Sequence, residues 1–223
     1  MVRYRASQPL QFVSFGGIAL SFTRADVEII SREDGFRGFY RLDVLQLRHR
    51  LFDGGWGPVL RRELFVRHDA VCVLPYDPWL DQLVLIEQVR VGALEKSDNP
   101  WMLELVAGLI DTDEAPEQVA HREAQEEAGL TLLSLHPITR YFPSPGGSDE
   151  RVYLYCALVD SRGAGGIHGL AEEGEDIRVS LWPRAEAIAA VEDGRIDNAA
   201  SIIALQWLQL HGERLRAEAG PQP

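Results

Sequence analysis

The pattern of apolar and polar positions differs between the two parts of the chain. Between residues 26 and 67, short apolar runs broken by glycines predict the strands and turns of a small antiparallel sheet. From Ala70 onward the runs become continuous, which is typical of buried strands, and helical signals alternate with them. The expected strands cover residues 27–30, 39–48, 60–66, 70–75, 83–91, 152–159 and 177–182.

Three helices are indicated by their end signals. Pro116 suits a first helical turn and Gly129 a left-handed end, so one helix is expected to run from Pro116 toward Gly129. Residues 184–193 predict a short helix that stops at Gly194. A last helix is expected after Asp197, a good N-cap, with the tail beyond Arg214 frayed. Its expected apolar face consists of Ala200, Ile203, Trp207 and Leu210.

These elements predict an α/β protein with a mixed sheet, preceded by a small antiparallel sheet. A length of 223 residues favours one main domain with an appendage. We expect an N-terminal β region over 1–67, an α/β domain over 68–214 and a flexible tail over 215–223.

Composition places the chain among folded, cytoplasmic proteins. Hydrophobic residues make up 46% and charged residues 25%, as in ordinary globular domains. No secretory signal and no apolar run long enough to span a bilayer stands out, so a cytoplasmic location is the default expectation. Cys72 and Cys156 lie in apolar runs and are expected to be buried, reduced thiols without chemistry.

A formal net charge of −12 argues against nucleic acids and anionic membranes as partners. An anionic substrate would need divalent metal ions or individually placed arginines. Lys96 is the only lysine among 22 basic side chains, and arginine suits bidentate phosphate contacts, although biased codon usage explains this equally well.

Three glutamates crowd the end of the helix that runs toward Gly129. Glu123 and Glu127 lie one turn apart and Glu126 flanks them, at the end where the helix dipole is negative. Their carboxylates suit Mg²⁺ or Mn²⁺. Taken alone, a solvated acidic face is the simpler interpretation.

The spacing around this helix changes that interpretation. Gly108, Glu114, Arg122, Glu123, Glu126, Glu127 and Gly129 stand in the order and spacing of the complete Nudix box, which the chain therefore resembles. The only departure is Ala124, which is smaller than the usual aliphatic residue and affects packing more than chemistry.

The resemblance implies an α/β/α sandwich in which the box binds Mg²⁺, or Mn²⁺ in its place, beside a substrate diphosphate. Glu123 and Glu127 would then be catalytic metal ligands, together with the carbonyl of Ala107. Glu126 would be a further ligand or support the other two. Arg122 and Glu114 would pair to hold the loop, and Gly108 and Gly129 would shape it.

The acidic loop before residue 177 is the expected source of the general base. Solvated charge is the ordinary explanation of its glutamates. The resemblance favours Glu173 as the base and Glu175 as a metal ligand, while the adjacent Glu172 leaves the assignment open.

Beyond the box, the chain resembles bacterial ADP-ribose diphosphatases from about residue 26 to residue 211. The matching segments are 37–39, 61–63, 85–88, 144–147, 166–170, 175–178 and 196–200. This resemblance implies hydrolysis of ADP-ribose to AMP and ribose 5-phosphate. The alternatives are another nucleotide-sugar, such as GDP-mannose, and a non-catalytic Nudix module that senses ADP-ribose.

The same resemblance implies a substrate-binding set and a homodimer with shared active sites. Phe39 would stack on adenine, and arginines would grip phosphate or ribose. The expected set is Arg37, Phe39, Arg62, Arg67, Arg90, Leu109, Ser144, Gly146 and Glu150, with Arg37, Phe39 and Ser144 serving the partner's pocket. Surface ion pairs, a core aromatic and a simple turn are the alternative interpretations. His168 is expected to be structural.

Overall fold

The computed structural model describes residues 22–222, which form two compact units. The first contains the described residues up to Arg67 together with Ser144–Asp149, and the second contains the rest. The segment 144–149 joins the first unit because Phe65 N donates to Gly147 O (2.7 Å) and Arg67 N donates to the Asp149 carboxylate (2.9 Å). The sequence had placed this segment in the α/β domain.

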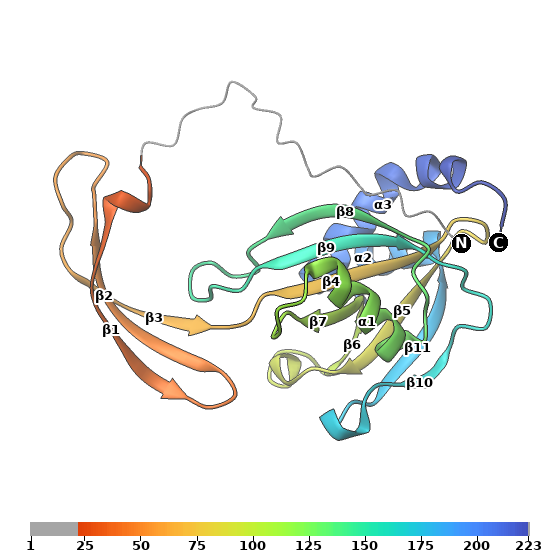
Figure 1. Ribbon diagram of the computed structural model, residues 1–223, viewed down its shortest axis with the longest axis horizontal. Helices are drawn as coiled ribbons and strands as arrows, with labels where there is room; N and C mark the ends of the chain where they lie inside the picture. The colour runs from red at the N-terminus through yellow and green to blue at the C-terminus, as the bar shows by residue number, and fades with distance from the viewer. Residues whose placement is uncertain (1–21, 223) are drawn as a thin grey trace. The chain divides into compact units, whose positions relative to one another are not determined.

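The first unit is a three-stranded antiparallel sheet in the order β1-β2-β3 (Figure 1). Its strands are β1 (Val27–Arg37), β2 (Arg41–His49) and β3 (Leu60–Val66), preceded by the 3-10 turn η1 (Arg24–Asp26). Strand β1 is longer than the expected strand over 27–30, because Gly35, one of the glycines expected to break the apolar runs, lies inside it. Asp34 and Phe36 pair with Asp43 and Leu42 across an irregularity, and the turn falls after Arg37.

The second unit is built on an eight-stranded mixed sheet in the order β10-β11-β5-β4-β9-β8, with β6 paired to β5 and β7 to β4. Strands β4 and β9 are parallel, and the other strand pairs of this sheet are antiparallel. The strands are β4 (Ala70–Asp77), β5 (Gln82–Val89), β6 (Trp101–Glu104), β7 (Val106–Leu109), β8 (Ser134–Tyr141), β9 (Val152–Leu158), β10 (Gly166–His168) and β11 (Ile177–Pro183).

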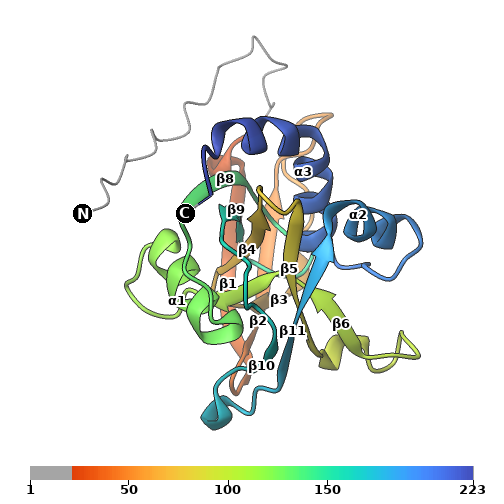
Figure 2. The ribbon, with the colours of Figure 1, turned by 90° about the vertical axis from the view of Figure 1, so that its right-hand side faces the viewer.

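Helices cover both faces of this sheet, because its central strands are apolar on both sides (Figure 2). Val84 and Ile86 belong to the core beneath α1 (Pro116–Ala128), whereas Leu83 and Leu85 belong to the core beneath α2 (Arg184–Glu192) and α3 (Ala199–Glu218). The 3-10 turns are η2 (Val91–Ala93) and η3 (Ala171–Glu173). The expected α/β/α sandwich is confirmed.

Helix α3 differs from its prediction in two respects. Leu210, expected on the apolar face, is 82% exposed, and the helix continues four residues past Arg214 with Leu215 fully buried. The buried face is Ser201, Ala204, Leu205, Leu208, Gly212 and Leu215. The tail expected to be flexible over 215–223 is thus helical as far as Glu218, and beyond the helix Trp79 Nε1 donates to Gly220 O (2.9 Å).

Both cysteines are buried and free, as expected. Among the described residues, no helix has the length and apolar character needed to cross a membrane.

Candidate functional site

Helix α1 presents its glutamates in its last two turns because its ends are fixed by sequence. Pro116 occupies the first helical position, where its missing N–H is not needed. Gly129 adopts φ +64° and ends the helix, and Leu130 N donates back to Ala124 O (2.9 Å). The helix therefore stops directly after Glu127 and Ala128.

Glu127 is buried against strand β7. Its side chain accepts a hydrogen bond from Ala107 N at 2.8 Å, and the residue is only 2% exposed. Burial raises the pKa of Glu127 to about 8, with further contributions from the charges of Glu123 and Glu175 and an opposing one from the Ala107 amide. The fold thus holds a carboxyl group where ionisation is unfavourable unless a cation lies beside it.

Glu123 lies directly over Gly108. A Cβ atom built on Gly108 would be only 1.9 Å from Glu123 Oε1, so a larger residue there cannot coexist with this side-chain position. Burial raises the pKa of Glu123 to about 7, Arg122 opposes this, and Glu126 and Glu175 add to it. The glycine expected to shape the loop is therefore the residue that allows Glu123 to lie against β7.

Arg122 joins the glutamates of the box. Its Nη1 donates to Glu123 Oε1 (2.8 Å) and Glu126 Oε2 (3.0 Å), and its Nε donates to Glu114 Oε2 (3.3 Å). The Arg122–Glu114 pair implied by the resemblance is thus present. The additional contacts to Glu123 and Glu126 were not foreseen, because pairing within a cluster depends on side-chain conformation.

Glu175 comes from the loop between β10 and β11. Its Oε2 accepts a hydrogen bond from Leu170 N (3.0 Å), while Glu173 and Glu172 are exposed on the η3 turn. The charge of Glu175 acts on both Glu123 and Glu127, so the fold brings this loop near the end of α1. Exposure does not distinguish Glu172 from Glu173 as a base.

The donor set fits a hard divalent cation. Within residues 22–222, no three acidic, histidine or cysteine side chains converge as a ready metal cage, and Arg122 binds Glu123 and Glu126. Nevertheless, the negative charge of Glu175 acts on both Glu123 and Glu127, and carboxylate oxygens are ligands that Mg²⁺ prefers. A bound divalent cation would offset that charge.

The remaining predicted residues divide between the two units. In the second unit, Arg90 Nε donates to Glu104 Oε2 (2.7 Å), Leu109 ends β7 and Glu150 is buried. In the first unit, Phe39 is 85% exposed with its ring edge-on to Tyr40, and Arg37 pairs with Asp34. The other members in the first unit are Arg62, Arg67, Ser144 and Gly146.

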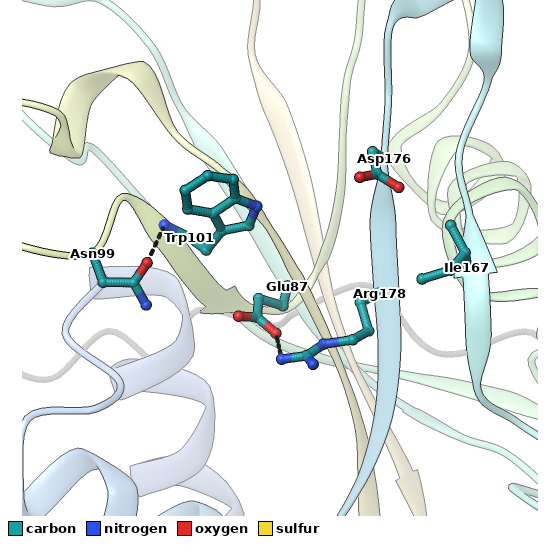
Figure 3. A pocket seen from close by; sticks show the side chains of 6 residues that line it. All are labelled: Glu87, Asn99, Trp101, Ile167, Asp176 and Arg178. Atoms are coloured by element: carbon teal, nitrogen blue, oxygen red, sulfur yellow. Dashed lines mark hydrogen bonds and ion pairs between the residues drawn. The ribbon is translucent and has the colours of Figure 1, made fainter.

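A separate hollow lies on the other face of the sheet (Figure 3). Glu87 and Arg178 form an ion pair across β5 and β11, and Ile167 pairs with Arg178 in register. Glu87 alternates in phase with Leu85, which faces α2 and α3, so this hollow of about 380 Å³ is not the carboxylate site. Its full lining is Glu87, Asn99, Trp101, Ile167, Asp176 and Arg178. Sequence reasoning gave no signal for Asn99 or Trp101.

Comparison with known proteins gives consistent results. ADP-ribose pyrophosphatase of Escherichia coli strain K12 is 51% identical over 201 residues, covering 90% of this chain and 96% of the relative. The protein of that name from Haemophilus influenzae is 44% identical over 198 residues, covering 87% and 91%. GDP-mannose pyrophosphatase of Cronobacter sakazakii is 36% identical over 159 residues, covering 70% and 82%.

A crystal structure of an ADP compounds hydrolase shares the fold, with a TM-score of 0.63 at 23% identity, covering 86% of this chain and 99% of that one. The family model described as the NUDIX domain matches residues 66–205, which include every strand of the second sheet and the whole of α1. The chain therefore belongs to the Nudix family of hydrolases.

Proposed function

We propose that this Nudix enzyme hydrolyses the diphosphate of ADP-ribose to AMP and ribose 5-phosphate with the help of a divalent metal ion. The proposal is carried by two neighbouring carboxyl groups, the half-buried Glu123 over Gly108 and the buried Glu127 on Ala107 N. Burying such groups together is unfavourable without a cation. The relatives named ADP-ribose pyrophosphatase, which match about nine tenths of the chain, support ADP-ribose over GDP-mannose.

In this proposal, the metal site consists of Glu123, Glu127, Glu175 and the carbonyl of Ala107, with Mg²⁺ or Mn²⁺ as the ion. When bound, the ion offsets the negative charge of the diphosphate and of the carboxylates. The Ala107 amide fixes one oxygen of Glu127, and Gly108 leaves room for Glu123. The Glu127 carboxylate is thereby pre-positioned before substrate binds.

The reaction adds water to one phosphorus. A P–O bond forms with the water oxygen, the bridging P–O bond breaks, and the water proton passes to a base, for which we propose Glu173. Glu172 and Glu175 are the alternatives in the same loop.

Binding of the nucleotide is assigned to the residues that the resemblance implies. Arg90 would contact phosphate or ribose, and Phe39 would stack on adenine through its exposed ring. The further members of this set are Arg37, Arg62, Arg67, Leu109, Ser144, Gly146 and Glu150.

We further propose that the enzyme is a cytoplasmic homodimer with shared active sites. Exposed aromatic side chains on the first unit, among them Phe36 and Phe39, support an interface there. Light scattering after size exclusion should give a mass near twice 24.9 kDa. A monomeric mass at micromolar concentration would contradict the dimer without affecting the proposed reaction.

A comparison of two substrates tests the proposed reaction. Purified protein with Mg²⁺ is given ADP-ribose and GDP-mannose separately, and the nucleotide monophosphate released is quantified by chromatography. AMP should form with the higher kcat/KM. Faster release of GMP would show that GDP-mannose, and not ADP-ribose, is the preferred substrate. Calorimetric binding of ADP-ribose without AMP release, with either Mg²⁺ or Mn²⁺, would instead establish a sensor module.

A further inference from the structure

His168 connects the end of helix α1 to the loop that carries the acidic residues. Its ring lies against Gly129, since a Cβ atom on that glycine would be 3.0 Å from His168 Cε1. Its Nε2 is 2.9 Å from Gly165 O. A carbonyl oxygen only accepts, so the ring carries a proton on Nε2 and donates to it. The ring therefore lies between the glycine that ends α1 and the residue directly before β10.

The next residues form a tight turn around Leu170. Leu170 N donates to Glu175 Oε2 (3.0 Å), and Leu170 O accepts from Glu173 N (3.0 Å) and Glu175 N (3.2 Å). Gly169 permits this turn, because it adopts φ +100° and a Cβ there would be 2.7 Å from Glu175 Cβ. The positions of Glu173 and Glu175 thus depend on the position of Leu170, two residues after His168.

We infer that His168 is a positioning residue, which holds the turn 170–175 beside the C-terminal end of α1 and thereby sets the positions of Glu173 and Glu175. This inference rests on the proposed function for its kinetic consequence. Strand β10 has three residues, lies at the edge of the sheet and pairs with β11 alone. Removing the ring between Gly129 and Gly165 leaves β10 with that strand pairing. Such short edge strands open locally at low free energy.

The test compares His168→Ala with His168→Gln, whose amide can still donate to Gly165 O. His211→Ala is the matched control, because His211 also contacts a backbone carbonyl, Trp207 O at 2.8 Å, but on α3 at the other face. Hydrogen exchange of the amides of Leu170, Glu173, Gly174 and Glu175 is measured without metal or substrate. Steady-state kinetics with ADP-ribose and Mg²⁺ follow.

His168→Ala should speed exchange of these four amides about tenfold or more and lower kcat about tenfold to hundredfold, because small misplacement of a reacting group is costly. KM should change less than about threefold, since the nucleotide-binding residues are untouched. His168→Gln should recover most of both effects, and His211→Ala should show neither.

Unchanged exchange at residues 170–175 overturns the inference. Faster exchange together with a kcat within twofold of the unmodified enzyme also overturns it, because catalysis then does not require the turn to be held. Should His168→Ala fail to fold, His168→Phe keeps a ring against Gly129 and removes only the donor, and the same comparison applies. If the unmodified enzyme releases no AMP, the proposed function fails, and hydrogen exchange alone decides whether His168 holds the turn.

Discussion

Replacing Gly108 by alanine tests how closely the box glycine and Glu123 depend on each other. The added Cβ would be 1.9 Å from Glu123 Oε1 and 2.1 Å from its Cδ, where ordinary contact begins near 3.4 Å. The carboxyl group must therefore move by about 1.5 Å, the difference between 3.4 and 1.9. Because Gly108 does not lie in the left-handed region, the backbone itself accepts alanine.

A shift of this size should reduce kcat by about 10²-fold, since misplacement by about 1 Å has effects of this order. That factor corresponds to about 2.7 kcal/mol of transition-state stabilisation. Stability should change by less than about 1 kcal/mol, because the Glu123 side chain yields rather than the backbone or the core.

The assay measures kcat for ADP-ribose with Mg²⁺ and the free energy of unfolding in urea. Gly92→Ala is the control, since a Cβ there meets nothing within 4 Å. Gly108→Ala with kcat within twofold of the unmodified enzyme would refute the requirement for Glu123 at this position. A loss of stability as large as the loss of activity would show that the damage is general.

Two further predictions concern stability. Asp81 accepts hydrogen bonds from Tyr76, Arg184 and Arg216. Burial alone would raise the pKa of Asp81, but these partners lower it below its ordinary value. An aspartate whose pKa is lowered by folding stabilises the fold at pH values above its unfolded-state pKa, and this contribution is lost as the pH falls. Asp81→Asn should therefore have a lower free energy of unfolding at pH 7, and that free energy should vary less with pH below about pH 4 in urea titrations. Identical pH profiles of the two proteins would contradict the assignment. Replacing the buried Leu215 by alanine should lower the free energy of unfolding in urea by about 2–4 kcal/mol, whereas replacing the exposed Leu210 should lower it by less than about 0.5 kcal/mol. The reverse order would show that α3 frays after Arg214.

The sequence predicted best those elements whose signal is local. Strands β4 and β5 are continuous apolar runs, and α1 has Pro116 at its start and Gly129 after its end. Strands β6, β7 and β10 have three or four residues, too few for a periodic pattern, and Pro137 interrupts β8. Helix α3 has apolar residues on most sides, so periodicity alone chose Leu210 over Leu215.

At the candidate site, too, features with a local signal were predicted and contacts that depend on the fold were not. Helical spacing placed Glu123, Glu126 and Glu127 at one end of α1. Spacing did not reveal that Ala107 N binds Glu127 or that Arg122 bridges to Glu123 and Glu126, because these contacts depend on where β7 packs and on side-chain rotamers. The contact between His168 and Gly129 joins residues far apart in sequence and needed the fold.

We propose that the carboxylates at the end of α1, the buried Glu127 and the half-buried Glu123, hold the divalent ion on which ADP-ribose hydrolysis depends. Glu127→Gln tests it most directly, with Glu117→Gln as control, because Glu117 lies on the same helix and accepts from Tyr155 instead. AMP release at saturating Mg²⁺ should fall at least about 10²-fold in Glu127→Gln, with Mg²⁺ binding weakened in calorimetry, and stay near normal in Glu117→Gln. Turnover and Mg²⁺ affinity close to those of the unmodified enzyme in Glu127→Gln would contradict the claim.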